Sequence, residues 1–257
     1  MLQPHQAHAL AAEAAGDVFA GAECAGVILE ALGKPAPQNG GDVLVLRNDA
    51  EQRQSCRSKR EMQRLIDEIR RHFDFCLIDA AAGIGEAFAL EAARRGMNLA
   101  LIDIEGDRLQ EVKKECEALG APKVVAITVD VSEYEQVRLS VKRIMAEFDR
   151  IDVFFSNAGV AGAGTLGNIP AQDWDWITSV NFLGMAYYVT EVLPIMKKQG
   201  TDAYFLFTIS IGGLQPGMRI QSAYTASKHA ALSLAESVKD YAVNYAPYIG
   251  VTAFCPE

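Results

Sequence analysis

The sequence predicts an α/β protein with a doubly wound parallel sheet of the Rossmann type, preceded by an alanine-rich helical extension. Two observations carry this prediction. From Asp42 onward, short apolar runs alternate with longer segments of helical periodicity, and the apolar runs are hydrophobic at almost every position. Such strands are typical of a parallel sheet covered by helices on both faces, and right-handed crossovers favour the doubly wound arrangement.

The predicted elements follow one another with little interruption. The apolar runs expected to form strands are Val43–Leu46, Phe73–Ile78, Leu99–Ile102, Val124–Val129, Val153–Phe155, Ala203–Thr208 and Val251–Phe254. The segments expected to form helices are Glu51–Arg71, Gly85–Arg95, Arg108–Ala118, Tyr134–Phe148, Trp174–Lys198 and Ala223–Tyr245. Before them, residues 1–41 are alanine-rich and end in the breaker stretch Pro35–Gly41. We therefore expect a helical extension over residues 1–41 and a Rossmann-type domain over residues 42–257.

Composition excludes several function classes. The net charge of −9 argues against nucleic-acid binding, which requires clustered lysine and arginine. The apolar segment Ala9–Leu32 carries acidic residues from Glu13 to Glu30, so we expect neither a signal peptide nor a membrane span. The five cysteines are scattered and form no CxxC pair, which indicates neither a metal site nor a disulfide framework. The pattern fits a reducing compartment, and we expect a cytoplasmic protein.

A glycine turn follows the predicted strand Phe73–Ile78. Gly83-Ile84-Gly85 opens the next helix, where glycines let the backbone approach a pyrophosphate and the helix end offers unpaired N–H groups. Glycines also occur at such turns merely for packing. The following strand ends in Asp103, eighteen residues after Gly85. A carboxylate there accepts hydrogen bonds from an adenosine ribose and repels a 2′-phosphate, which favours NAD over NADP. The alternative is a helix N-cap or a turn aspartate.

A tyrosine and a lysine begin the last predicted helix. Tyr224 and Lys228 lie one helical turn apart on one face, and a nearby ammonium lowers the pKa of a phenol from ~10. Tyr224 could then exchange a proton with an alcohol or carbonyl group. Ser210, after the strand Ala203–Thr208, could hold the substrate oxygen beside it. The alternative for the Tyr–Lys spacing is an exposed helix pair.

These motifs, taken together, resemble the short-chain dehydrogenase/reductase family over residues 72–257. The order and spacing are those of the family for Gly83-Ile84-Gly85, Asp103, Asp130-Val131, Asn157-Ala158-Gly159, Asn181, Ser210 and Tyr224 to Lys228. The resemblance implies an oxidoreductase that transfers a hydride between a nicotinamide cofactor and a small alcohol or ketone. It also implies a homodimer or homotetramer, which the helices Trp174–Lys198 and Ala223–Tyr245 would form.

The resemblance implies a role for each matching residue. Tyr224 would be the general acid/base, Lys228 would bind the nicotinamide ribose and tune Tyr224, and Ser210 would orient the substrate. Asn181 would hold a proton-relay water; without the resemblance it reads as a polar residue inside a helix. The cofactor-binding set implied by the family is Gly83, Ile84, Gly85, Asp103, Asp130, Val131, Asn157, Ala158, Gly159, Tyr224, Lys228 and Pro256. Within it, Asp130 would bind the adenine edge, and Asn157 to Gly159 would support the central strand.

The chain departs from the family pattern at three places. The Thr-Gly that opens the family's glycine motif is Ile78-Asp79 here. The sequence ends at Glu257, where the family has a Pro-Gly loop and a last strand, and about 70 residues precede the first family strand. The first strand and its turn, Phe73–Ile84, also resemble the strand and Asp-x-Pro-Ala-Gly-Ile turn of Min- and ParA-type ATPases, with Ala81 replacing the proline.

Three hypotheses about function therefore stand. The first is a nicotinamide-dependent oxidoreductase, and the second is a Rossmann module that binds cofactor weakly and does not catalyse. The third is a nucleoside-triphosphate switch, which the lack of a GxxxxGK[ST] loop disfavours. The substrate pocket would be built from the loops around Val160–Pro170 and Gly212–Gln221, whose sequences do not identify a substrate.

Overall fold

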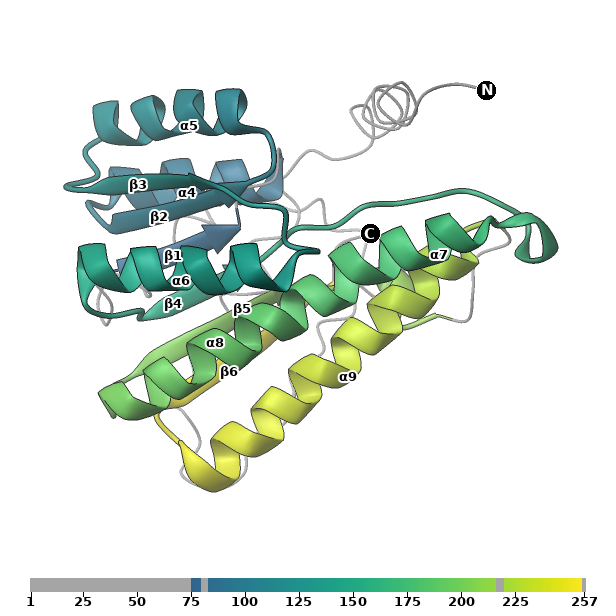
Figure 1. The fold of residues 1–257 in the computed structure, drawn as a ribbon. Helices are drawn as coiled ribbons and strands as arrows, with labels where there is room; N and C mark the ends of the chain where they lie inside the picture. The colour runs from purple at the N-terminus through teal and green to yellow at the C-terminus, as the bar shows by residue number, and fades with distance from the viewer. Residues whose placement is uncertain (1–74, 80–82, 216–219, 256–257) are drawn as a thin grey trace, which may run out of the picture.

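The computed structural model describes residues 75–79, 83–215 and 220–255. Within them the chain forms one parallel sheet with helices on both faces (Figure 1). The predicted α/β class and Rossmann-type sheet are confirmed. The predicted extension over residues 1–41, the strand Val43–Leu46 and the helix Glu51–Arg71 lie outside the described residues.

The sheet has the strand order β3-β2-β1-β4-β5-β6. The strands are β1 (Phe75–Asp79), β2 (Asn98–Asp103), β3 (Val124–Thr128), β4 (Val153–Ser156), β5 (Ala203–Thr208) and β6 (Ile249–Phe254). Every neighbouring pair is parallel. The chain runs outward from β1 to β3 and then crosses back to β4, so the order reverses between β1 and β4. In doubly wound sheets ligands bind at this reversal, outside the carboxyl ends of the strands.

Each crossover between strands contains a helix or a set of helices. They are α4 (Ile84–Arg94), α5 (Gly106–Ala118), α6 (Tyr134–Phe148), α7 (Ala171–Thr178), α8 (Gly184–Gln199) and α9 (Ser222–Tyr245). Short 3-10 turns occur at Leu166–Asn168 and Ile211–Gly213. The apolar positions of these helices repeat at helical spacing, and burial of that face against the sheet stabilises them.

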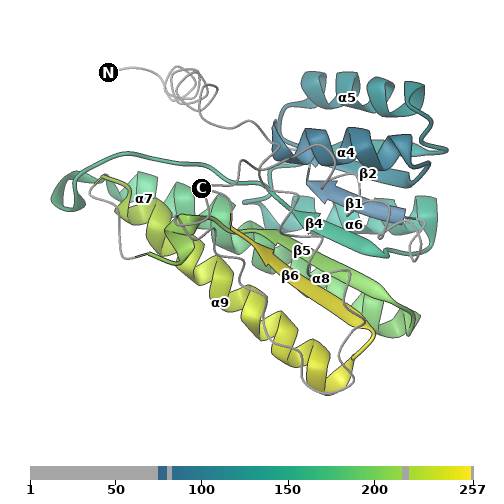
Figure 2. The same cartoon turned by 180° about the vertical axis from the view of Figure 1, so that it is seen from behind.

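Two hydrophobic cores lie on opposite faces of the sheet. On one face α4 and α5 pack over β1 to β3 (Figure 2). In this core Phe88 of α4 lies against Phe155 of β4 at a ring-centroid distance of 4.9 Å. The other face is covered by α6, α8 and α9 (Figure 1). The core on that side includes Phe154, Phe205 and Tyr188. Because side chains are buried on both faces of the central strands, these strands are largely apolar, which is the pattern that predicted the fold.

One predicted helix is divided. The segment Trp174–Lys198 was expected to be continuous, but α7 ends at Thr178, a π-helical turn spans Ser179–Leu183, and α8 begins at Gly184. The expectation of a single helix is therefore wrong in this detail. Single π turns inside helices occur frequently at functional sites, and this one contains Asn181.

None of the helices in the described part of the chain combines the length and apolarity needed to cross a lipid bilayer.

Candidate active site

Gly83 precedes α4 in a backbone conformation that favours glycine. Gly83 has φ +94°, a conformation that residues with a β-carbon rarely adopt, and a β-carbon placed there would meet no atom within 4 Å. Gly83 caps α4 without a side-chain hydrogen bond, so the N–H groups of the first turn are not capped by that residue. An open, glycine-lined helix N-terminus is suited to a pyrophosphate.

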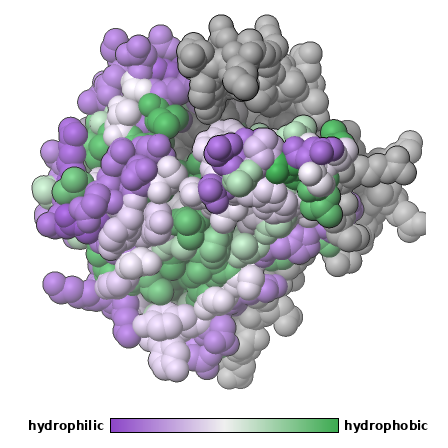
Figure 3. Space-filling model, turned by 45° about the vertical axis from the view of Figure 1, so that its right-hand side comes forward, coloured by the Kyte–Doolittle hydropathy of each residue, from purple (hydrophilic) through white to green (hydrophobic). Residues whose placement is uncertain are grey.

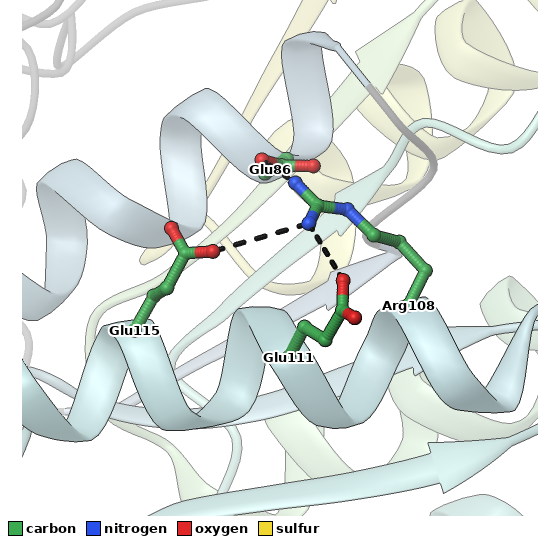
Figure 4. Close-up of polar contacts among 4 residues, drawn as sticks. All are labelled: Glu86, Arg108, Glu111 and Glu115. Atoms are coloured by element: carbon green, nitrogen blue, oxygen red, sulfur yellow. Dashed lines mark hydrogen bonds and ion pairs between the residues drawn. The ribbon is translucent and has the colours of Figure 1, made fainter.

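One arginine of α5, surrounded by three glutamates, joins the first turns of α4 and α5 (Figure 4). Arg108 of α5 contacts Glu86 of α4 at 2.5 Å, Glu111 at 3.0 Å and Glu115 at 3.9 Å. The carboxylates raise the pKa of the Arg108 guanidinium, mainly through hydrogen bonds from Glu111 and Glu86. The contact with Glu86 ties together the two turns that follow β1 and β2, where the glycine motif and Asp103 lie.

Asp103 lies at the carboxyl end of β2. Its Oδ1 accepts a hydrogen bond from the Glu105 backbone N–H at 2.9 Å, and its carbonyl accepts one from the Val129 N–H at 2.9 Å. Burial raises the pKa of the Asp103 carboxyl, and the backbone hydrogen bond from Glu105 opposes this rise. No side-chain cap was found for α5, whose N-cap is Glu105, so Asp103 is not the N-cap of that helix.

Asp130, Val131 and Asn157 follow β3 and β4 at the same edge of the sheet. Asp130 Oδ1 accepts hydrogen bonds from Ser132 N at 2.9 Å and Ser132 Oγ at 2.6 Å. Asn157 Oδ1 accepts a hydrogen bond from Thr208 Oγ1 at 2.9 Å, which joins the ends of β4 and β5. Val131 packs closely on the start of α8, because a β-carbon on Gly184 would lie 2.9 Å from Val131 Cγ2.

The side chain of Asn181 is buried and fully engaged. Its Oδ1 accepts from the Val160 N–H at 2.7 Å, and its Nδ2 donates to the Val160 carbonyl at 2.9 Å and to Ser227 Oγ at 2.9 Å. These bonds fix the loop after β4 to the π turn. That Asn181 is a site residue stays a prediction, and its side chain holds the surrounding backbone in place.

Ser210 and Tyr224 meet beneath the turn Ile211–Gly213. Ser210 Oγ accepts from the Gly212 N–H at 3.0 Å, and a β-carbon on Gly212 would lie 3.2 Å from Tyr224 Cε1. Burial raises the pKa of the Tyr224 phenol above its ordinary value of 10.0, and a hydrogen bond with Ser210 acts in the opposite direction. The lowering expected from Lys228 alone is therefore not present in this structure, because loss of solvent outweighs the stabilisation of the phenolate.

Lys228 is a buried cation at the centre of the site, only 3% exposed. Its Nζ donates to the Thr208 carbonyl at 3.2 Å and lies 5.8 Å from the centroid of the Tyr224 ring. A β-carbon on Gly159 would lie 3.2 Å from Nζ, so a glycine is needed for the loop to approach this closely. Tyr224 and Lys228 are therefore not an exposed helix pair.

The structure adds residues that the motifs did not single out. Thr208 anchors both Asn157 and Lys228, and Ser227 anchors Asn181. Cys255 is buried at the edge of the site, where a hydrogen bond with the Ser210 backbone opposes the burial that raises its thiol pKa. Thr208 and Ser227 directly neighbour the motifs, at the end of β5 and within Tyr224 to Lys228. That position was the available sequence signal.

Some predicted positions are not part of this geometry. Pro256 and residues 80–82 lie outside the described residues, and so do the side-chain surroundings of Ile78 and Asp79. Among the described residues no group of histidine, cysteine and carboxylate side chains is arranged to hold a metal ion. The remaining predicted residues gather at the carboxyl edge of the sheet, around the reversal between β1 and β4.

A family model described as short chain dehydrogenase matches residues 75–257. The chain belongs to this family. The short-chain dehydrogenase motifs and the geometry described above therefore coincide over the same residues, from the glycine turn through the Tyr224–Lys228 pair.

Two relatives illustrate the similarity. A CLA biosynthesis dehydrogenase/reductase of Lactiplantibacillus plantarum is 38% identical over 160 residues, which are 62% of this chain and 54% of the relative. Levodione reductase of Leifsonia aquatica is 33% identical over 178 residues, 68% of this chain and 65% of the relative. The short-chain dehydrogenase chain thus spans between 54% and 65% of the length of these relatives.

Solved structures share the fold. A short-chain dehydrogenase/reductase from Burkholderia phymatum, in complex with NAD, superposes with a TM-score of 0.68 at 33% identity, covering 71% of this chain and 64% of that one. An alcohol dehydrogenase from Thermococcus sibiricus, complexed with 5-hydroxy-NADP, superposes with a TM-score of 0.62 at 28% identity, covering 68% and 72%. The two neighbours differ in the nicotinamide cofactor that they hold.

Proposed function

We propose that the chain is a nicotinamide-dependent oxidoreductase that interconverts an alcohol and a carbonyl compound, and that it takes NAD in preference to NADP. The observation that carries this proposal is the convergence of Ser210, Tyr224 and the buried Lys228 at the carboxyl ends of the parallel strands. A bound nicotinamide supplies the hydride donor or acceptor at its C4 atom. The chain supplies binding, orientation and the proton.

Tyr224 handles the proton in this proposal. Because burial raises its pKa, the neutral phenol is the resting form, ready to donate to a carbonyl oxygen during reduction. Ser210 contacts Tyr224 and orients the substrate oxygen toward it. In the oxidation direction the phenolate form of Tyr224 accepts the proton of the alcohol, and the ammonium of Lys228, 5.8 Å from the ring centroid, stabilises that form.

The cofactor residues fit an adenine dinucleotide. The turn at Gly83 offers space and backbone N–H groups for the pyrophosphate, and Asp103 lies at the adjacent strand end for the ribose hydroxyls. Asp130 would bind the adenine edge, and Gly159 lets the loop after β4 approach Lys228, which would hold the nicotinamide ribose. The preference for NAD rests on the like charge that Asp103 presents to a 2′-phosphate.

Self-association through α8 and α9 is part of the proposal. Partly buried apolar side chains on these helices include Tyr187, Leu193, Ile195, Leu232 and Leu234, and Val243 and Tyr245 are exposed. Figure 3 shows a hydrophobic band across the side of the molecule on which α8 and α9 lie. Apolar residues on more than one helix face support a dimer or tetramer. We also propose that the protein is cytoplasmic, because its cysteines are scattered and form no CxxC pair, which fits a reducing compartment.

A second candidate function is a Rossmann module that binds cofactor weakly and does not catalyse. The observation in its favour is Asp79, which places a carboxylate where the family pattern has glycine. Calorimetric titration with NAD(H), NADP(H) and ATP distinguishes the candidates. Tight binding of NAD(H) supports the oxidoreductase, weak binding of all three supports the module, and preferential binding of ATP would overturn both.

A further inference from the structure

The hydroxyl of Ser227 links two parts of the site that lie far apart in sequence. It donates to the Tyr224 carbonyl at 2.7 Å, one turn earlier in α9, and accepts from Asn181 Nδ2 at 2.9 Å. Ser227 is 3% exposed and Asn181 is 2% exposed, so water does not compete for these bonds. In a dry environment the loss of either partner leaves a polar group without compensation.

Ser227 completes the hydrogen bonding of Asn181. The amide nitrogen of Asn181 has two hydrogens, and these go to the Val160 carbonyl at 2.9 Å and to Ser227 Oγ at 2.9 Å. The amide oxygen accepts from the Val160 N–H at 2.7 Å. Since the bond to Tyr224 orients the hydroxyl hydrogen away from Asn181, a lone pair of Ser227 is directed toward the amide.

The anchored amide also determines where the loop after β4 lies. A β-carbon on Gly159 would lie 3.4 Å from Asn181 Oδ1 and 3.2 Å from Lys228 Nζ, so this loop passes close to both side chains. Hydrogen bonds therefore run from the Tyr224 carbonyl through Ser227 and Asn181 to Val160, whose neighbour Gly159 lies near Lys228. Displacement of Asn181 would shift the Gly159–Val160 backbone next to the buried ammonium.

We infer that Ser227 is a positioning residue for proton transfer, which holds Asn181 and the Gly159–Val160 backbone in the register that Lys228 and Tyr224 require. The inference rests on the proposed oxidoreductase function. Ser227 does not touch the reacting atoms itself, and its effect passes through Asn181. A hydroxyl is needed at this position because the same atom must both donate and accept.

The chain offers a matched control in Ser140 of α6. Ser140 Oγ also donates to a carbonyl one turn earlier, that of Val137 at 2.7 Å, and lies 3.0 Å from the hydroxyl of Tyr188. Ser140 is 2% exposed, close to the 3% of Ser227, but its contacts lie between α6 and α8. Ser140→Ala therefore removes the same group at similar burial away from the site.

The test compares Ser227→Ala, Ser227→Thr and Ser140→Ala by kcat, KM, NADH affinity and Tm. Misplacement of catalytic groups by a fraction of an ångström should lower kcat of Ser227→Ala roughly tenfold or more while the Kd for NADH stays within about a factor of two. Ser227→Thr should restore kcat, because it keeps the hydroxyl. Ser140→Ala should lower Tm to a similar extent with kcat unchanged. Equal kcat in Ser227→Ala and Ser140→Ala overturns the inference.

A second measurement does not depend on catalysis. The Val160 N–H donates to Asn181 Oδ1, so its hydrogen exchange reports whether Asn181 is held. Exchange at Val160 should be faster in Ser227→Ala than in the parent and unchanged in Ser140→Ala. If the parent oxidises no alcohol with any nicotinamide cofactor, the proposed function fails, and the exchange rates still decide the positioning claim. Unchanged exchange in Ser227→Ala would contradict it.

Discussion

Lys228 Nζ lies 5.8 Å from the centroid of the Tyr224 ring and donates to the Thr208 carbonyl at 3.2 Å. The hydrogen bond to Thr208 ties the buried lysine of α9 to the end of β5, close to the Tyr224 ring. This arrangement makes Tyr224 the group whose removal should be most informative.

Tyr224→Phe should abolish dehydrogenase activity and leave the fold and NADH affinity nearly unchanged. The substitution deletes the transferable proton and keeps the ring that packs near Gly212. General acid/base catalysis contributes ~10²–10⁴-fold, so a residual rate above about one tenth would contradict the assigned role. Steady-state kinetics measure the dehydrogenase activity, and fluorescence titration measures the affinity for NADH.

Tyr224 should ionise only above pH 10 in the cofactor-free chain, because burial raises its pKa from 10.0. The neutral phenol is the form that the fold favours, so its contribution to stability is present below the unfolded pKa and is lost as the pH rises through the folded value. The tyrosinate absorbance of the parent minus that of Tyr224→Phe isolates this group. A Tyr224 transition below pH 10 without cofactor would show that the lysine outweighs burial.

The parent chain should bind NAD more tightly than NADP, and Asp103→Ser combined with Ile104→Arg should reverse the preference. Asp103 presents a negative charge at the end of β2, and Ile104 is 62% exposed, so an arginine there can reach a 2′-phosphate. Affinities for both cofactors, measured at one salt concentration, test the prediction. Tighter binding of NADP by the parent would mean that Asp103 does not meet the ribose.

Asp79→Gly should strengthen NAD binding by about an order of magnitude or more, because a side chain there would crowd the turn and its charge would oppose the two phosphate charges. The backbone of Asp79 pairs with Ile102 at the end of β1, next to the turn that opens at Gly83. Ile78→Thr should add a smaller gain through a turn-stabilising hydroxyl. If Asp79 instead points to solvent in a remodelled turn, Asp79→Gly leaves the affinity for NAD unchanged. NADH fluorescence titration separates the two results.

Val243→Glu should weaken self-association, since it places a charge on the apolar surface of α9. Leu166→Glu is the control, because Leu166 is also exposed but belongs to the 3-10 turn Leu166–Asn168. Light scattering across a dilution series gives the masses. A parent that is monomeric throughout would rule out the proposed interface.

The sequence by itself determined the order of strands and helices and the identity of the candidate site residues. Apolar runs and helical periodicity are local properties, so they predicted α6 with the bounds Tyr134–Phe148 that the structure has. The glycine turn, Asp103 and the Tyr224–Lys228 spacing are likewise short-range signals. These signals predict a site at the carboxyl ends of the strands without any information on tertiary packing.

Only the tertiary structure decided how those residues are held and how they titrate. The π turn around Asn181 accompanies hydrogen bonds to Val160, which is 21 residues away, and to Ser227, which is 46 residues away. The pKa of Tyr224 rises because elements from across the chain remove water from its hydroxyl, whereas the sequence showed only the neighbouring lysine. Desolvation and hydrogen-bond partners depend on which distant segments meet, and no local pattern records that.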